Sequence, residues 1–103
     1  MSSTEERVSR LHAGRLIDLH FDLPLSLFLS RPRRNVIAAD FLPEFEAGEI
    51  GLLGVALYIE VQYVPDQALR VALDRVALLK VELESTSRLV LCKTSAEIEQ
   101  AQV

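Results

Sequence analysis

The chain has 103 residues, of which 50% are hydrophobic, and its 15 acidic and 11 basic residues give a net charge of −4. This length and composition predict one small domain with a hydrophobic core, and the acidic balance excludes the basic surface typical of nucleic-acid-binding proteins. A single cysteine, Cys92, excludes an internal disulfide framework and suits a reducing compartment.

No segment has the character of a signal or of a membrane span. The first ten residues are polar and charged, without the apolar stretch of a secretory signal. The longest apolar run, Ile50 to Ile59, is about half as long as a bilayer-spanning helix. We therefore expect a soluble, cytoplasmic protein that contacts neither membrane nor nucleic acid.

The N-terminal third predicts a polar segment, a strand and a short helix. Residues 1–15 form the polar N-terminal segment, which is partly helical. Leu16 to Leu19 is short and apolar, as in a fully buried strand. Asp22 and Pro24 break this pattern, and Leu25 to Leu29 is expected to form a short helix that leads into a loop of arginine and proline.

The middle of the chain predicts a helix and a second strand. Asp40 is placed to cap a helix that runs to Ala47, and Gly48 is placed to end it. Leu52 to Ile59 is continuously apolar, which is typical of a parallel strand buried on both faces.

The last third predicts a long helix, a third strand and a final helix. The long helix opens at Pro65 and Asp66 and ends near residues 85–87. Its expected core stripe, spaced at helical intervals, is Leu69, Leu73, Val76, Leu79 and Leu83. A short apolar strand is expected at Leu89 to Cys92. Thr94 and Glu97 then fit a capping box that starts the final helix.

Strands and helices thus alternate three times along the chain. Alternation of this kind implies parallel strands joined by crossover helices. The sequence therefore predicts an α/β fold of about three βα units.

The end of the first strand has the clearest chemical potential. Residues i and i+2 of an extended segment point to the same side, so His20 and Asp22 can aim an imidazole and a carboxylate at one point. Both groups are metal ligands in proteins. Asp18 shares this side and either orients the imidazole or accepts hydrogen bonds from backbone amides. Asp22 could alternatively cap the following helix.

The segment Ile17 to Pro24 reads I-D-L-H-F-D-L-P and resembles the opening I-D-x-H-x-D-L-P signature of the membrane (renal) dipeptidase family, the zinc-dependent dipeptidases. The likeness continues at Phe41 to Pro43, Gly48 to Gly51 and Ala56 to Ile59. Leu89 to Ala101 is similar to the family's third strand and the helix after it. One departure lies at residues 53–55, where Leu-Gly-Val replaces the common Gln-Phe-Trp.

This resemblance implies that residues 16–103 are the N-terminal part of a (β/α)8 TIM-type barrel with a two-metal zinc site at the C-terminal ends of its strands. His20 and Asp22 would be its first two metal ligands, and Asp18 a candidate partner of the imidazole. The substrate would be a small dipeptide, hydrolysed with metal assistance. The bridging glutamate and later histidines of the family have no counterpart here, so the resemblance implies an incomplete chain that is inactive alone and holds no complete catalytic set.

Four further residues near the strand ends carry weaker signals. We expect Glu60 to be a solvated loop residue, Tyr58 to line the core or the pocket wall, and Cys92 to be an inert small hydrophobe. His12 precedes the first strand, at the end opposite to the site, and is expected to be exposed.

Two alternatives to the dipeptidase reading remain open. The chain could be a non-catalytic α/β module that self-associates through its exposed sheet edges. It could also belong to the wider metal-dependent amidohydrolases, although these more often open with His-x-His than with His-x-Asp. The cluster of Arg31, Arg33 and Arg34 is expected to be a solvated loop, and phosphate binding is its functional alternative.

Overall fold

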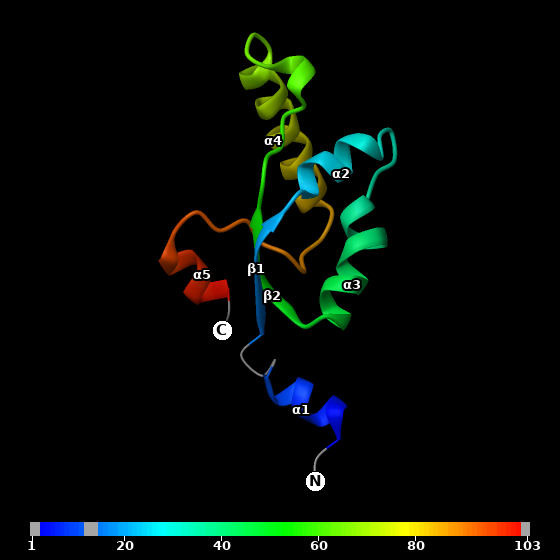
Figure 1. Ribbon diagram of the computed structural model, residues 1–103, viewed down its shortest axis with the longest axis vertical. Helices are drawn as coiled ribbons and strands as arrows, with labels where there is room; N and C mark the ends of the chain where they lie inside the picture. Colours follow the sequence, from blue (N-terminus) through cyan, green and yellow to red (C-terminus); the bar gives the residue numbers. More distant parts are fainter. Residues whose placement is uncertain (1–2, 12–14, 102–103) are drawn as a thin grey trace.

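Two parallel strands lie at the centre of the fold, and helices surround them (Figure 1). The computed structural model describes residues 3–11 and 15–101. In chain order the elements are α1 (Thr4–Leu11), β1 (Leu16–Phe21), α2 (Leu23–Leu29), the π-helical segment η1 (Ile37–Phe41), α3 (Leu42–Ala47), β2 (Ile50–Val55), the 3₁₀ turn η2 (Val61–Tyr63), α4 (Ala68–Glu84) and α5 (Ser95–Ala101). The described chain is elongated, with principal extents of 58 × 28 × 26 Å.

The register of β1 on β2 is irregular near the C-terminal end of β1. Asp18 pairs with Leu53, and the next pair is Phe21 with Val55, so two residues of β1 lie opposite Gly54 alone. This is the two-against-one count of a β-bulge. Gly54 permits it, because a Cβ atom there would lie 2.6 Å from the carbonyl oxygen of Leu19. The absence of a side chain lets the two backbones approach closely.

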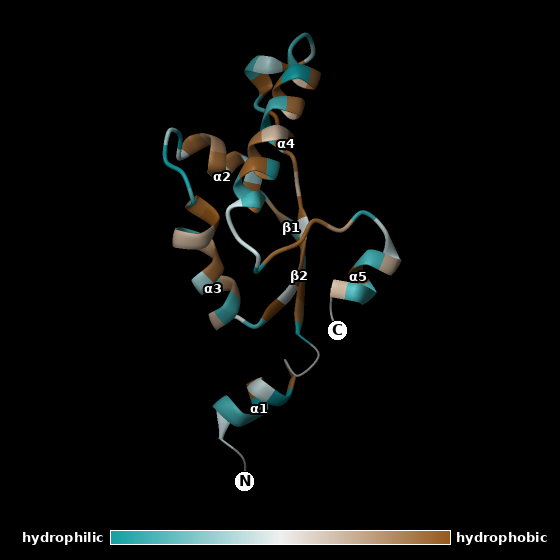
Figure 2. Ribbon diagram, turned by 180° about the vertical axis from the view of Figure 1, so that it is seen from behind, coloured by the Kyte–Doolittle hydropathy of each residue, from teal (hydrophilic) through white to brown (hydrophobic). Residues whose placement is uncertain are grey.

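The core lies between the sheet and the helices α2 and α4. Its buried cluster consists of Leu23, Leu27, Val36, Ile37 and Leu79. The rings of Phe21, Phe41 and Phe45 pack beside it, with Phe21 meeting the other two edge-on at centroid distances of 5.8 and 5.4 Å. Colouring by hydropathy shows apolar residues along both strands and most of α2 (Figure 2).

The face of α4 that packs on the core differs from the predicted stripe. Leu79 is buried as expected, but Leu69 and Leu73 are exposed. The buried positions are instead Arg75, Leu79 and Glu82, at spacings of four and three residues. The predicted stripe holds for Leu79 and for the partly buried Leu83, which packs against the core cluster, and it is wrong for Leu69 and Leu73. It missed Arg75 and Glu82 because a hydropathy pattern assigns charged residues to the exposed face.

Local capping signals account for two of the helix starts. At α5 the amide of Glu97 donates to Thr94 Oγ1 at 3.1 Å, as predicted, while the Glu97 carboxylate accepts from the amide of Lys93. At α1 the amide of Glu6 donates to Ser3 Oγ at 3.1 Å, and the amide of Ser3 donates to the Glu6 carboxylate. The reciprocal bonds at α1 satisfy two amides that the first helical turn leaves unpaired.

Several predicted boundaries are corrected. The middle helix begins at Ile37, so Asp40 lies inside it and caps nothing. The second strand ends at Val55, before the predicted Ile59. The long helix begins at Ala68, because a turn precedes it in which the amide of Gln67 donates to the carbonyl of Tyr63.

The predicted third strand, Leu89 to Cys92, is wrong. This segment lies in the described part of the chain and pairs with neither strand of the sheet. Leu89 packs against the core cluster, while Val90 and Leu91 stay exposed. Because no side chain of this segment is fully buried, it gains little apolar burial of the kind that holds a central strand in a sheet.

The structure thus confirms a mixed α/β fold with parallel strands, and residues 3–11 and 15–101 contain two strands where three were predicted. Among the described residues, no helix has the length and apolar character needed to span a membrane.

Candidate functional site

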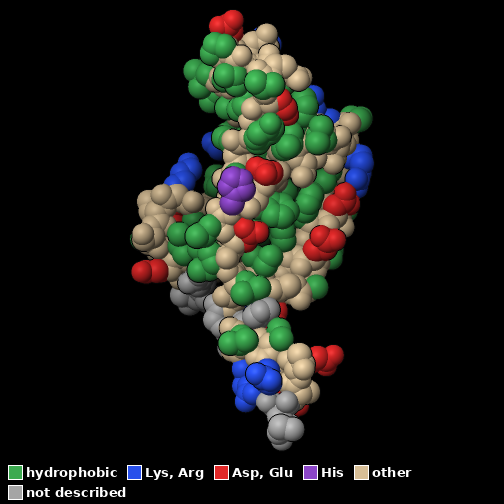
Figure 3. Space-filling model, viewed as in Figure 1, with side chains coloured by type: hydrophobic (Ala, Val, Ile, Leu, Met, Phe, Trp, Pro, Cys, Tyr) green, Lys and Arg blue, Asp and Glu red, His purple; other side chains and the backbone are tan. Residues whose placement is uncertain are grey.

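The side chains of His20 and Asp22 meet at the C-terminal end of β1. Nε2 of His20 lies 3.6 Å from Oδ1 of Asp22, and both side chains are open to solvent, 75% and 46% exposed. The histidine, drawn purple in Figure 3, lies on the open surface of the molecule. The alternation of an extended chain correctly predicts that the two groups share a side.

The β-bulge gives this strand end its shape. Leu19 and His20 are the two residues that lie between the paired positions Asp18 and Phe21. Oδ1 of Asp18 accepts a hydrogen bond from the amide of His20 at 3.0 Å. Bulges unpair backbone groups and re-aim side chains, and they are frequent beside functional sites. Here the Asp18 carboxylate satisfies the His20 amide, and the imidazole is directed outward.

Asp18 therefore contacts the backbone of His20. Of the two roles that the sequence left open, this contact corresponds to the carboxylate that accepts from a backbone amide. The capping alternative for Asp22 is not realised, since its side chain makes no capping hydrogen bond to α2. The Asp22 carboxylate is left available beside the imidazole.

A metal ion would find two ligands at this point. Two ligand atoms at zinc–ligand distances of 2.0–2.1 Å and a tetrahedral angle lie about 3.3 Å apart. The observed 3.6 Å between Nε2 and Oδ1 fits that spacing after a small side-chain adjustment. Over residues 3–11 and 15–101, however, no group of three or more histidine, cysteine, aspartate or glutamate side chains is placed to hold a metal.

A second polar cluster, which the sequence did not predict, lies after β2. Glu60 was expected to be free in solvent, but both of its carboxylate oxygens accept from Nη2 of Arg75, at 2.9 and 2.7 Å. Nη1 of Arg75 donates to the carbonyl of Tyr58. The Arg75 side chain is 1% exposed, and its guanidinium carbon lies 4.5 Å from the centre of the Phe28 ring.

Electrostatics strengthen this pairing. Hydrogen bonding from Arg75 lowers the pKa of the Glu60 carboxyl below its ordinary value, against an opposing effect of desolvation. Arg75 lies at helical spacing from Val71 and Leu79, and this spacing is the one signal that marks it as inward-facing. The pair fixes α4 against the segment that leaves the C-terminal end of β2, on which Tyr58 and Glu60 lie.

The remaining sequence candidates contribute little to the site. The Tyr58 side chain is exposed, so it does not line the core, and its expected alternative place in a pocket wall stays a prediction. Cys92 is half-buried and its thiol lies 3.9 Å from the carbonyl oxygen of Val90, consistent with an inert position. His12 lies outside the described residues.

Comparisons with known proteins give no further assignment. The chain has no significant match among protein-family models, curated proteins or solved structures.

Proposed function

We propose that this chain contributes two metal ligands, His20 and Asp22, to a zinc-dependent dipeptidase of (β/α)8-barrel type. The single observation that carries the proposal is the 3.6 Å approach of Nε2 and Oδ1 at the C-terminal end of a parallel strand. This is the end of the strands at which TIM-barrel active sites form. The resemblance of residues 17–24 to the family's opening signature supports the same assignment.

The described residues supply only part of such a metal site. A paired-metal site needs a bridging carboxylate and more ligands than two, and the described residues offer no third. These ligands therefore come from outside residues 3–11 and 15–101. In such a site His20 and Asp22 would hold the zinc ion, which would supply polarisation of the dipeptide carbonyl. The chain in isolation is expected to hydrolyse no dipeptide.

Zinc titration by calorimetry tests the assignment. The wild-type chain is expected to bind zinc weakly and saturably, and His20→Ala and Asp22→Asn are each expected to abolish that binding. Glu97→Gln, which removes an exposed carboxylate at the start of α5, serves as the matched control and is expected to leave it unchanged. Equal binding by all four proteins would overturn the ligand assignment, and dipeptide hydrolysis at stoichiometric zinc would overturn the incomplete site.

A second candidate function has its own observation. The two-stranded sheet exposes apolar side chains that no part of the described chain covers, including Ile17 and Leu19, the latter 81% exposed. Two-stranded sheets with open edges are poorly stable alone and invite pairing with another chain. We propose as the alternative a non-catalytic α/β module that self-associates through this sheet.

Light scattering during size-exclusion chromatography separates the alternatives. Self-association through the sheet predicts a metal-independent dimer or larger species that Leu19→Asp converts to monomer. Leu69→Asp, which introduces the same charge at an exposed leucine of α4, is expected to leave the assembly intact. A monomeric wild-type chain would exclude this second function.

A further inference from the structure

A surface pocket of about 530 Å³ lies between the loop after α2 and the C-terminal half of α4. Its lining residues are Arg31, Pro32, Arg33, Arg34, Leu78, Val81 and Glu82. None of them belongs to the metal-ligand pair at the end of β1. Lys and Arg side chains gather along the edge of the molecule where this loop lies (Figure 3). Three arginines thus line one hollow in a protein whose net charge is −4.

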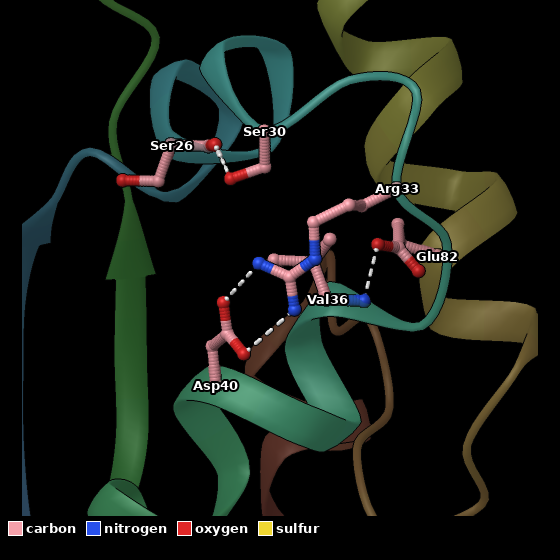
Figure 4. A network of polar contacts seen from close by, with 6 residues as sticks. All are labelled: Ser26, Ser30, Arg33, Val36, Asp40 and Glu82. Atoms are coloured by element: carbon pink, nitrogen blue, oxygen red, sulfur yellow. Dashed lines mark hydrogen bonds and ion pairs between the residues drawn. The ribbon is translucent and has the colours of Figure 1, made fainter.

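The loop that carries the three arginines is held in place at both ends. At its start, Ser30 Oγ donates to the carbonyl of Ser26 at 2.8 Å, and the amide of Arg33 donates to the carbonyl of Ser30 at 3.0 Å. At its end, the buried amide of Val36 donates to Oε1 of Glu82 at 2.8 Å (Figure 4). A pocket with a fixed backbone loses little conformational freedom when a ligand binds.

The three arginines differ in how far their charge is already satisfied. Arg33 makes a two-bond pair with Asp40, at 2.8 and 2.9 Å, which raises the pKa of Arg33 and lowers that of Asp40 (Figure 4). Arg31 uses only Nε, which donates to the carbonyl of Phe28, and its guanidinium lies 4.0 Å over the Phe28 ring. Within the described chain, Arg34 has neither a hydrogen-bond nor an ion-pair partner.

The stacking on Phe28 orients Arg31 without using its two terminal nitrogens. These nitrogens and the whole guanidinium of Arg34 remain as donors beside the pocket. The one carboxylate in the lining, Glu82, is 4% exposed and already accepts from the amide of Val36. The accessible part of the lining is therefore cationic, with an apolar wall formed by Leu78 and Val81.

We propose that this pocket binds a phosphate monoester whose organic part is apolar. A phosphoryl dianion presents three oxygens and can accept two-bond pairs from both Arg31 and Arg34, whereas a carboxylate is satisfied by one such arginine. The organic part contacts Leu78 and Val81. Arg33 is held by Asp40, whose carboxylate offsets its charge, so Arg33 borders the pocket without a direct bond to the ligand. The three arginines are exposed, as expected of a solvated loop, and the proposal adds a binding role to this exposed cluster.

Calorimetric titration of the full chain with phenyl phosphate tests this proposal at about 0.15 M salt, where long-range attraction between exposed charges is screened. Saturable binding is expected, with weaker binding of inorganic phosphate, which lacks the apolar part, and weaker still of benzoate, which lacks the dianion. Arg34→Gln is expected to weaken phenyl phosphate binding by about tenfold or more, as loss of a charge-assisted pair implies. Arg34 is exposed and unpaired, so the substitution leaves the fold intact.

Arg70→Gln is the matched control, because Arg70 is an exposed arginine of α4 outside the pocket lining. It is expected to bind phenyl phosphate as the wild type does. Equal weakening in both variants would show that net charge alone attracts the ligand, and would overturn the proposal. Absence of saturable binding by the wild type, or benzoate binding as tight as that of phenyl phosphate, would overturn it as well.

Discussion

Arg75 on α4 and Glu60 after β2 form a two-bond ion pair in which Nη2 of the arginine reaches both carboxylate oxygens, at 2.9 and 2.7 Å. The same guanidinium stacks on Phe28 of α2 and donates to the carbonyl of Tyr58. One side chain thus joins the long helix, the first helix after β1 and the chain that leaves β2. Its Nε is buried without a hydrogen-bond partner, so all hydrogen bonds of the Arg75 side chain come from its two terminal nitrogens.

Replacing Arg75 by methionine is expected to destabilise the fold by about 2–3 kcal/mol. Breaking a fully buried ion pair costs roughly 3–5 kcal/mol. The expected loss is smaller because the Glu60 side chain keeps 24% exposure and can be rehydrated. Urea unfolding followed by circular dichroism measures the change. Arg70→Met provides the control, and an equal loss in both variants would show that the buried pair has no special role.

Acid is expected to weaken the contribution of Glu60. Hydrogen bonding from Arg75 lowers the pKa of Glu60 in the folded chain below its ordinary value of 4.5. A lowered folded pKa means that the stabilisation is complete above the ordinary value and is lost as pH falls through the folded value. The difference in unfolding free energy between wild type and Glu60→Gln should therefore stay constant well above pH 4.5 and shrink as the pH falls from there through the lowered folded pKa.

Unfolding curves measured across that range test the sign of the effect. Asp40, whose pKa is also lowered by its arginine partner, is present in both proteins, so its titration cancels in the difference. A difference that stays constant or grows toward low pH would contradict the assignment.

Removing the Glu82 carboxylate should lower the free energy of unfolding, because the hydrogen bond to the Val36 amide is lost. Glu82 is 4% exposed, and its Oε1 accepts a hydrogen bond from the buried amide of Val36. Val36 itself belongs to the hydrophobic core. In Glu82→Ala that amide loses its acceptor, at a cost of about 1–3 kcal/mol. Hydrogen exchange of the Val36 amide, measured by NMR, is expected to accelerate in parallel with the loss of stability.

Glu84→Ala supplies the comparison on the same helix. Glu84 is exposed, so its removal should change stability by less than about 0.5 kcal/mol. If both glutamate variants lost the same stability, or if exchange at Val36 were unchanged in Glu82→Ala, the hydrogen bond would not be stabilising the loop.

Sequence patterns predicted the elements better than the contacts between them. The strand at Leu16, the helix after Asp22 and the capping pair of Thr94 and Glu97 follow from local propensity, and the structure contains all three. Such signals act over a few residues and can be read from neighbouring positions. The shared side of His20 and Asp22 was expected from their two-residue spacing, although Asp22 lies one residue beyond the end of β1.

The long-range contacts of Arg75 and Glu82 were not predicted, because a hydropathy pattern assigns charged residues to the exposed face of a helix. Arg75 and Glu82 lie on the buried face of α4, where a hydropathy pattern expects leucine. Their partners, Glu60 and the amide of Val36, lie 15 and 46 residues away in the sequence. The β-bulge at Leu19 and His20 was not predicted either, since the alternating pattern of a strand assumes one-to-one pairing. Gly54 is the one residue in the sequence that indicates a close approach of the two backbones.

Substitution of Gly54 by alanine tests that close approach directly. The new Cβ would lie 2.6 Å from the carbonyl oxygen of Leu19 and 2.9 Å from its carbonyl carbon, contacts that force β1 and β2 apart. Overpacking of this kind costs about 1–3 kcal/mol. Because the bulge positions His20, the spacing of the imidazole and the Asp22 carboxylate should change too. Unfolding measurements and the NMR shift of the His20 ring report the two effects.

Gly48→Ala is the matched substitution. Its nearest atom, the carbonyl oxygen of Glu44, would lie 3.3 Å from the added Cβ, and the backbone φ of −83° suits alanine. A few tenths of an ångström of adjustment relieve that contact, so the loss of stability should be clearly smaller, with no shift at the His20 ring. Equal stability losses, or an unperturbed His20 ring in Gly54→Ala, would mean that the strands tolerate a side chain at the bulge and that Gly54 does not determine the geometry of the site.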